Sequence, residues 1–334
     1  MACRLNADGK SFDKAAENLR RTAQVHLSGE TLRVLVETEG RRVLQAQRSG
    51  QLPLEWSAAD GRGATKTTRL YVGSDGVMVP LVTDAEKTAR RDRVNQRRRR
   101  RGKEARPSSP RRPGADQHSK EFKIVASYDE DQEHRLVSGT RGDGEAAGRL
   151  MRREAGRVRM DLADEKIGNV DGSPWIRNQV ERQSLPLDAL GLDFDHLSEN
   201  VHRGRREIYG EDDAAGEAWA GELLHVFKHD GYEAAWRRLL EWRVGLRHGR
   251  PAADRLISYV SERRDMIRYP EFRAKGWQIG SGPTEATCKT LTARLKGSGM
   301  RWDADNAEAI MALEALSQSG QWDQYGKSQL RPTG

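Results

Sequence analysis

Three acidic residues of this chain stand in similar surroundings, each beside a turn rich in glycine or proline. They are Asp75 in YVGSDGV, Asp171 in IGNVDGSPW and Glu285 in IGSGPTEA. Clustered carboxylates repel one another at neutral pH unless cations lie between them. Magnesium suits that role, because it prefers oxygen ligands and keeps water and substrate phosphate in its shell. Two such ions about 3.5–4 Å apart can activate a water or a DNA 3′-hydroxyl, so the three residues together would predict phosphodiester chemistry.

Each of the three also has an ordinary structural interpretation. Asp-Gly between two apolar runs is the strongest short-range hairpin signal, so Asp75 and Asp171 are both candidates for turns. Gly282 is suited to the N-cap of a helix and Pro283 to its first position, which places Glu285 in the first turn, where the helix dipole favours negative charge. Turn, cap and metal ligand therefore stay open from these residues alone.

A second group of candidate ligands follows in LGLDFDHLSEN. Asp193, Asp195 and His196 combine carboxylate and imidazole, which are common metal ligands, and would centre a metal-dependent phosphohydrolase. At a junction between a strand and a helix, the competing interpretation is that one aspartate caps the helix while the histidine packs.

The charge of the chain points to an anionic partner. Its 334 residues include 58 Lys+Arg against 50 Asp+Glu, a formal net charge of +8, and nucleic acid is the commonest partner for such a soluble protein. The two cysteines exclude a disulfide framework or a cysteine-rich zinc site. Because we find no signal-peptide core and no apolar run of about 18 residues, we expect a cytoplasmic protein without a membrane span.

The elements that must position these residues follow from the apolar patterns. TRLYVGSDGVMVPLV predicts a buried strand pair with Asp75-Gly76 at its middle, and EFKIVASYDE with EHRLVSG predicts a hairpin. EKIGNV predicts a strand ending at Asp171-Gly172, and LDALGL predicts a strand leading into the helix after Asp193. Strands that alternate with helices indicate an α/β fold with a mixed sheet flanked by helices. The arginine-rich run at about 86–120 predicts a disordered loop that either grips phosphates without sequence preference or is simply solvated.

Two further regions are helical. Apolar spacing predicts helices over 12–19 and 32–36, with Ser28 capping the second, and they form either a helix-turn-helix with 30–39 in a DNA major groove or a hairpin that packs on its neighbour. From 217 to 264 the chain reads as amphipathic helices anchored by apolar residues that we assign to the core: Trp219, Leu223, Phe227, Trp236, Leu240 and Trp242.

Two of these segments resemble a known family. LDFDHLSENV, with its Asp-x-x-His spacing, and GWQIGSGPTEATCKTLTARLKGSGMRW resemble the DDE transposases of bacterial insertion sequences, most of all the Kra-type group and more distantly the Mutator-like transposases. The similarity runs from about 11 to 318. It implies an RNase H-like core, a helical insertion before the last acidic residue, and Mg²⁺-dependent cutting and joining of transposon-end DNA. The resemblance also implies an N-terminally shortened copy, because such proteins usually carry more sequence before SFDKAAENL.

The resemblance also assigns roles to individual residues. Asp75 corresponds to the first acidic ligand and Glu285 to the third, with two Mg²⁺ ions, or Mn²⁺ in their place, as cofactors. Asp171 is the preferred second ligand, with Asp193 as the alternative and His196 as an auxiliary residue. The predicted contacts to DNA phosphates are Lys289, Arg294, Lys296 and Arg301.

The expected organisation follows from both arguments. We predict an N-terminal helical region at 1–62, a first part of the core at 63–205, a helical insertion at 206–270, a second part of the core at 271–320 and a tail at 321–334. The expected function is DNA transposition by a homo-oligomer on DNA near the nucleoid. The alternatives are a non-catalytic DNA-binding regulator and the phosphohydrolase centred on Asp193.

Overall fold

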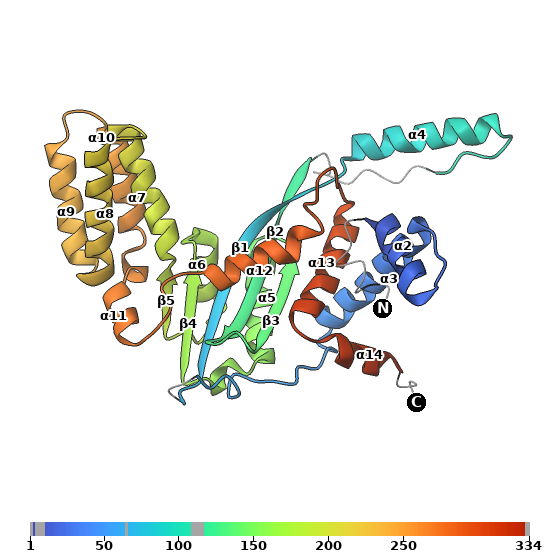
Figure 1. Cartoon of the computed structure of the whole chain (residues 1–334), viewed down its shortest axis with the longest axis horizontal. Coiled ribbons are helices and arrows are strands. Elements are labelled where there is room, and N and C mark those ends of the chain that lie inside the picture. The colour runs from blue at the N-terminus through green and yellow to red at the C-terminus, as the bar shows by residue number, and fades with distance from the viewer. Residues whose placement is uncertain (1–2, 4–10, 64–65, 108–116, 331–334) are drawn as a thin grey trace.

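A five-stranded mixed sheet of order β3-β2-β1-β4-β5 forms the centre of the molecule (Figure 1). The structure, a computed structural model, describes residues 3, 11–63, 66–107 and 117–330. The strands are β1 (Arg69–Pro80), β2 (Ser119–Asp129), β3 (Arg135–Thr140), β4 (Glu165–Val170) and β5 (Ala189–Leu192). β1, β2 and β3 pair antiparallel, whereas β4 and β5 run parallel to β1. The α/β class and the early antiparallel strands are therefore confirmed.

β1 is one continuous strand, so the predicted strand pair with a turn at Asp75-Gly76 is wrong. Asp75 lies opposite Ile124, within an uninterrupted register that runs from Leu70 to Pro80 along β2. The Asp-Gly signal is local, and here the long ladder with β2 satisfies the backbone of both residues without a turn. The other predicted hairpin, β2 with β3, is confirmed.

Helices cover both faces of the sheet. Successive residues of β2 point to opposite faces, so Ile124 packs in the cluster with α13 (Ala304–Gln318) and Val125 packs in the cluster with α5 (Gly144–Arg157). α12 (Gly282–Ala293) lies on β1 and β2. α6 (Pro174–Arg182) packs beside α5 and follows β4, as the short 3-10 helix η1 (Met160–Leu162) follows α5.

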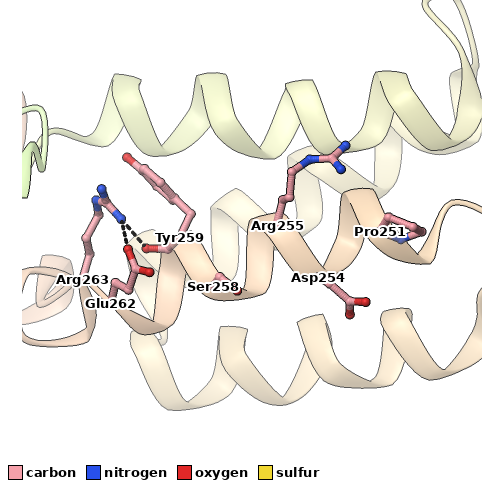
Figure 2. Close-up of a pocket in the computed structure, with 7 residues that line it drawn as sticks. All are labelled: Pro251, Asp254, Arg255, Ser258, Tyr259, Glu262 and Arg263. Atoms are coloured by element: carbon pink, nitrogen blue, oxygen red, sulfur yellow. Dashed lines mark hydrogen bonds and ion pairs between the residues drawn. The ribbon is translucent and has the colours of Figure 1, made fainter.

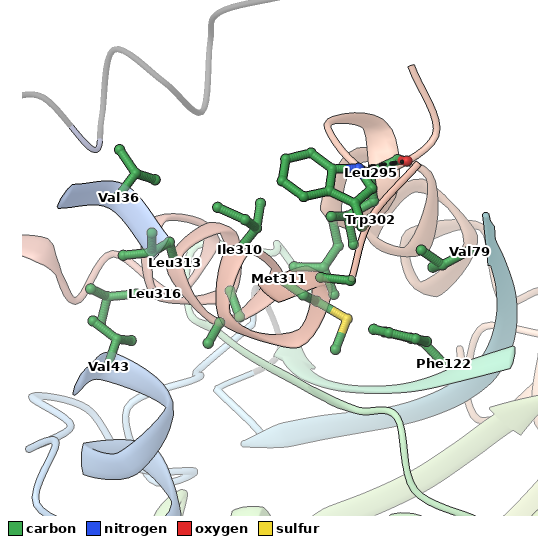
Figure 3. Packing of buried hydrophobic residues seen from close by; sticks show 14 of the residues in the cluster. Val36, Val43, Val79, Phe122, Leu295, Trp302, Ile310, Met311, Leu313 and Leu316 are labelled. Atoms are coloured by element: carbon green, nitrogen blue, oxygen red, sulfur yellow. Dashed lines mark hydrogen bonds between the residues drawn. The ribbon is translucent and has the colours of Figure 1, made fainter. Parts of the chain in front are cut away.

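The largest core cluster joins the sheet to the N-terminal helices through α13 (Figure 3). α3 (Gly29–Arg48) and α2 (Phe12–Ala23) form the predicted helical hairpin, and the Ser28 hydroxyl caps α3 by accepting from the Thr31 amide at 3.0 Å. A Cβ at Gly40 would lie 2.5 Å from the Ala309 carbonyl oxygen, so α3 and α13 approach closely. The hairpin therefore packs on its neighbour along one face of α3, while Leu35 on that helix is exposed.

A block of helices stands beside β5, at the left of Figure 1. It comprises α7 (Phe194–Tyr209), α8 (Ala214–His229), α9 (Tyr232–Gly245), α10 (Arg250–Ser261), η2 (Arg264–Met266) and α11 (Tyr269–Ala274). Trp219 and Trp242 stack with ring centroids 3.9 Å apart, which supports the core role of these tryptophans, whereas Leu240 is 40% exposed. α7 runs across the predicted boundary between 205 and 206. α14 (Trp322–Leu330) occupies most of the predicted tail.

The first part of the basic run, residues 86–100, is a helix, so the prediction of a disordered loop is wrong there. α4 (Asp84–Arg100) begins with a capping box, in which the Thr83 hydroxyl accepts from the Glu86 amide at 3.2 Å and the Glu86 carboxylate accepts from the Thr83 amide at 3.0 Å. Residues 108–116 of the predicted loop lie outside the described residues. Among the helices that the structure describes, none is long and apolar enough to cross a bilayer.

Candidate active site

Asp75 lies half-buried in the middle of the central strand β1. Its Oδ1 accepts a hydrogen bond from the Gly76 amide at 2.6 Å. Burial raises the pKa of the Asp75 carboxyl, and the negative charges of Asp171 and Glu285 raise it further, against the opposing effects of the Gly76 hydrogen bond and of His196. All three predicted ligands therefore lie within one another's electrostatic field.

Asp171 directly follows β4, the parallel neighbour of β1. Its two carboxylate oxygens accept from the Ser173 amide at 2.8 Å and from the Ser173 hydroxyl at 2.6 Å. Gly172 between them has a φ of 78°, a conformation that glycine adopts readily. This side-chain turn fixes the orientation of the Asp171 carboxylate at the carboxyl end of the strand.

Glu285 lies in the first turn of α12 with its side chain 51% exposed. Oε1 accepts from the Ser281 hydroxyl at 3.2 Å and lies 3.6 Å from Nε2 of His196 on α7. Ser281 is the N-cap residue, one position before the predicted Gly282, and no side chain caps α12. The Ser281 carbonyl accepts the first intrahelical hydrogen bond, from the Glu285 amide at 3.0 Å. The carboxylate of Glu285 is thus available for a role other than capping.

Asp193, the alternative second ligand, is fully buried and joins two helices. Oδ1 accepts from the amides of Asp195 and His196, at 2.6 and 3.1 Å, and so caps α7. Oδ2 accepts from the Ser281 amide at the start of α12. Asp193 is fully buried and its oxygens accept from backbone amides of two helices, so it positions His196 and Glu285 relative to each other. Asp171 is only partly buried, and it stays the preferred ligand.

Three strands hold the segment that precedes α12. The Tyr71 hydroxyl on β1 accepts from the Gln278 amide at 3.1 Å, and Asn169 on β4 donates to the Gln278 carbonyl at 2.9 Å. The amide of Phe194, just after β5, donates to the carbonyl of Ile279 at 2.9 Å. Sequence reasoning did not identify Tyr71 or Asn169, because their role depends on contacts with a segment far away in the chain.

Gly73 provides the seat of α12 on the sheet. A Cβ at this position would clash with the Thr284 side chain, so only glycine lets α12 approach β1 this closely. Gly73 lies two positions before Asp75 on the same strand, and Thr284 directly precedes Glu285. The first and third predicted ligands are therefore placed by one close contact.

The predicted DNA contacts divide into two groups. Lys289 and Lys296 are exposed, and within the described part of the chain neither makes an ion pair. Arg294 is buried, with its guanidinium 4.9 Å from the ring centre of Phe12 and 5.3 Å from that of Trp302, and this burial lowers its pKa. Its role here is packing, so we no longer count it as a phosphate contact.

Arg301 also has partners within the protein. It donates to the Leu81 carbonyl at 2.7 Å, forms an ion pair with Glu86, and lies 3.0 Å from Nδ1 of His118. These bonds tie the loop after α12 to the end of β1 and the start of α4. Arg301 is therefore an internal link between these segments.

A separate groove of about 610 Å³ runs along α10 in the helical block (Figure 2). None of the three predicted ligands lines it. Arg263 at one end donates through Nε to the carbonyl of Gly172 at 3.1 Å, and its guanidinium lies 4.0 Å from the ring centre of Tyr259. The helical block thus contacts the backbone directly after Asp171, a link that sequence reasoning missed.

The donors suit magnesium by type, although their positions do not form a finished site. Carboxylate oxygens are the ligands that Mg²⁺ prefers. The pKa of Asp75 is raised mainly by burial and further by the like charges of Asp171 and Glu285, a repulsion that a cation would relieve. Within the described residues, no group of three His, Cys, Asp or Glu side chains is arranged to hold a metal ion.

Comparison with known proteins adds no assignment. The chain matches no family model, and no curated protein matches it.

Proposed function

We propose that the chain is a DDE transposase that binds the DNA ends of an insertion sequence and catalyses Mg²⁺-dependent hydrolysis and strand transfer. The observation that carries this proposal is the placement of Asp75 on the central strand, Asp171 at the end of the parallel neighbour and Glu285 on the helix across them. Three antiparallel strands followed by two parallel ones, with a helical block before the last acidic residue, support the RNase H-like core that the resemblance implies.

In this proposal, Asp75, Asp171 and Glu285 hold the two metal ions. The ions would activate the attacking oxygen and stabilise the leaving oxygen of an in-line displacement. His196 lies next to Glu285 and orients its carboxylate, while Asp193 fixes the backbone that carries both.

Lys289 on α12 and Lys296 just after that helix are the proposed phosphate contacts. Lys289 lies one helical turn after Glu285, and Lys296 follows the helix; both are exposed. Since two DNA ends must be held together for joining, we expect a homo-oligomer on DNA. The substrate places the protein with the nucleoid in the cytoplasm.

The decisive experiment incubates the full chain with a plasmid carrying the DNA that flanks its coding sequence, with Mg²⁺ or with chelator. Nicking or joining only with Mg²⁺ supports the proposal, and no cleavage under any metal condition would overturn it.

Two conservative variants decide the second ligand. Asp171→Asn keeps the side-chain turn, which asparagine also forms, and removes the ligand charge, so we expect a normal melting temperature and lost cleavage. Asp193→Asn turns an amide donor toward backbone donors, so we expect a lower melting temperature and an unchanged metal requirement. If instead Asp171→Asn cleaved normally and Asp193→Asn were stable but inactive, Asp193 would be the ligand.

One observation favours a second candidate, a non-catalytic DNA-binding regulator. No metal-binding group of three ligands is formed among the described residues. A regulator would bind DNA in a salt-sensitive manner that survives Glu285→Ala, and it would show no Mg²⁺-dependent nicking. We set aside the phosphohydrolase centred on Asp193, because both carboxylate oxygens of that residue are engaged by backbone amides.

A further inference from the structure

α4 extends away from the rest of the chain, with no buried residue along its length (Figure 1). A helix that is polar all round gains nothing from core packing and must be stabilised in another way. Its contacts with the body lie at its base, where Lys87 pairs with Asp303 and Glu86 pairs with Arg301. α4 is therefore an arm that is attached to the body at its base and is bonded further along, through Asn95 and Arg98, to the segment that directly follows it.

α4 is strongly cationic along its length. α4 contains eight basic residues against three acidic ones. Within the described chain, none of its seven arginines makes an ion pair, and Arg98 donates to the backbone carbonyl of Glu104 at 2.7 Å. Like charges three or four positions apart on a helix repel one another, so the isolated arm carries an electrostatic cost that a polyanion would remove.

The cations are concentrated on one side of the helix. At 3.6 residues per turn, all the basic residues of α4 except Arg99 fall within roughly half of the circumference. The opposite half carries the neutral or acidic Thr88, Asp92, Asn95 and Gln96. A one-sided basic face matches a partner that presents a line of negative charge along one side of the arm.

The residues of α4 restrict the chemistry of that partner. Val94 is its only large apolar residue, so the arm lacks the apolar face that a membrane surface or a packed protein interface requires. The major groove of B-DNA, about 12 Å wide, admits an α-helix, whereas the deep and narrow major groove of duplex RNA does not. Duplex DNA is the polyanion that best fits a helix of this kind.

We propose that α4 is an arm that lies along duplex DNA and binds its phosphates through the basic face, without sequence preference. Of the two amide residues that flank that face, Asn95 is already bonded to the backbone of Arg106, at 3.0 and 2.8 Å, so it is not free to read a base. The proposal takes its partner from the proposed function but does not depend on the metal ligands. Because the base of α4 is paired with Arg301 and Asp303, this second DNA contact starts beside the segment that follows α12.

The test measures binding of the full chain to duplex DNA of random sequence, in chelator, over about 50–200 mM salt. The variant Arg90→Gln/Arg93→Gln/Arg97→Gln removes three charges from the basic face. The matched control Arg237→Gln/Arg238→Gln/Arg247→Gln removes three exposed charges from the helical block. At about 0.9 per phosphate contact, we expect the arm variant to reduce the slope of log K against log salt by roughly 2–3. The control should change the slope by far less, and both should keep the wild-type melting temperature.

Two results would overturn the proposal that α4 binds duplex DNA. Equal slopes for the arm variant and the wild type would show that α4 does not bind phosphates. Tighter arm-dependent binding to duplex RNA or to vesicles of anionic lipid would show that DNA is the wrong partner. Because no metal is present, binding that depends on the arm without any Mg²⁺-dependent cleavage would refute only the proposed enzyme, and cleavage with arm-independent binding would refute only the arm.

Discussion

α12 and α4 begin in the same way but end up in opposite environments. Each carries a glutamate in its first turn; α12 has one cation further along, Lys289, whereas α4 has eight basic residues. α12 buries Thr284, Cys288 and Leu291 against the sheet and the core, whereas α4 buries none of its residues. α12 is placed by packing and α4 by its cap, so two helices that share a first-turn glutamate position its charge in different ways.

The two glutamates show this difference most directly. Glu86 completes the capping box of α4 and pairs with Arg301, so its carboxylate is used within the protein. Glu285 makes no such cap and faces His196 and the two strands that carry the predicted aspartates. A first-turn glutamate is therefore a candidate ligand only where its carboxylate does not take part in a cap.

The largest expected effect separates these glutamates by activity. Glu285→Gln should reduce Mg²⁺-dependent cleavage by at least about a hundredfold, because loss of a metal ligand removes several kcal/mol of charge stabilisation. Glu86→Gln should leave the rate at saturating DNA within about twofold, since glutamine also completes a capping box. Plasmid nicking measures both, and equal losses in the two variants would contradict the assigned roles.

A second test compares the packing of the two helices. Leu291→Ala should lower the free energy of unfolding by about 2–5 kcal/mol, because Leu291 lies on the buried face of α12 and is fully buried. Val94→Ala on α4 should change it by less than about 0.5 kcal/mol, because Val94 is exposed. Denaturant unfolding gives both values, and a large loss in Val94→Ala would mean that α4 packs against another part of the chain.

A smaller effect concerns the caps. Thr83→Ala removes the side-chain cap of α4 and should weaken this helix by about 1 kcal/mol, which corresponds to roughly fivefold faster amide exchange along the arm. Ser281→Ala should leave exchange in α12 unchanged, because the Ser281 hydroxyl does not cap that helix. Hydrogen exchange measured helix by helix distinguishes the two cases, and unchanged exchange in the arm would argue against a helix held by its cap.

The smallest expected effect concerns Asp75 beneath α12. Its pKa is raised in the folded protein, mainly by burial, so the folded state binds this proton more tightly than the unfolded chain does. Stability is therefore lost as the pH rises through the raised pKa, and ionised Asp75 is destabilising at pH 7. In chelator, Asp75→Asn should melt at a higher temperature than wild type near neutral pH.

Melting curves check this sign and the role of the metal. The difference between Asp75→Asn and wild type should vanish near about pH 3, where the aspartate is protonated in both states. Addition of Mg²⁺ at pH 7 should raise the melting temperature of the wild type and not that of the variant, because only a folded state with its ligands binds the ion. A melting difference that did not depend on pH would show that Asp75 acts through packing.

Much of the fold could be predicted from local patterns, and the errors have local causes. The β2–β3 hairpin, the end of β4 and the helical block follow from apolar alternation and periodicity, which burial enforces. The turn at Asp75 was wrong because pairing with β2 depends on residues far away in the sequence. α4 was missed because it has no apolar period, although the Thr83–Glu86 capping box was visible in the sequence.

The candidate site was less accessible from the sequence. The residue types and the elements that carry Asp75, Asp171 and Glu285 could be proposed, and their role as ligands stays a prediction. The groups that position them could not be foreseen: the Gly73 seat and the link made by Asp193 exist only once separate segments meet. Arg294 shows the converse, since a cation in a basic stretch is here a packing residue.

The bonds between the start of α7 and the start of α12 have a consequence for how the chain can change in length. The chain leaves the sheet after β5 at Asp193 and returns to it at Ser281, where α12 begins. The carboxylate of Asp193 accepts from the amide of Ser281. The helical block is therefore an insertion whose first and last residues are hydrogen-bonded to each other. A block of this kind can change in length while its two ends stay together, so the geometry of the proposed site depends on the bond between the ends and not on the size of the block.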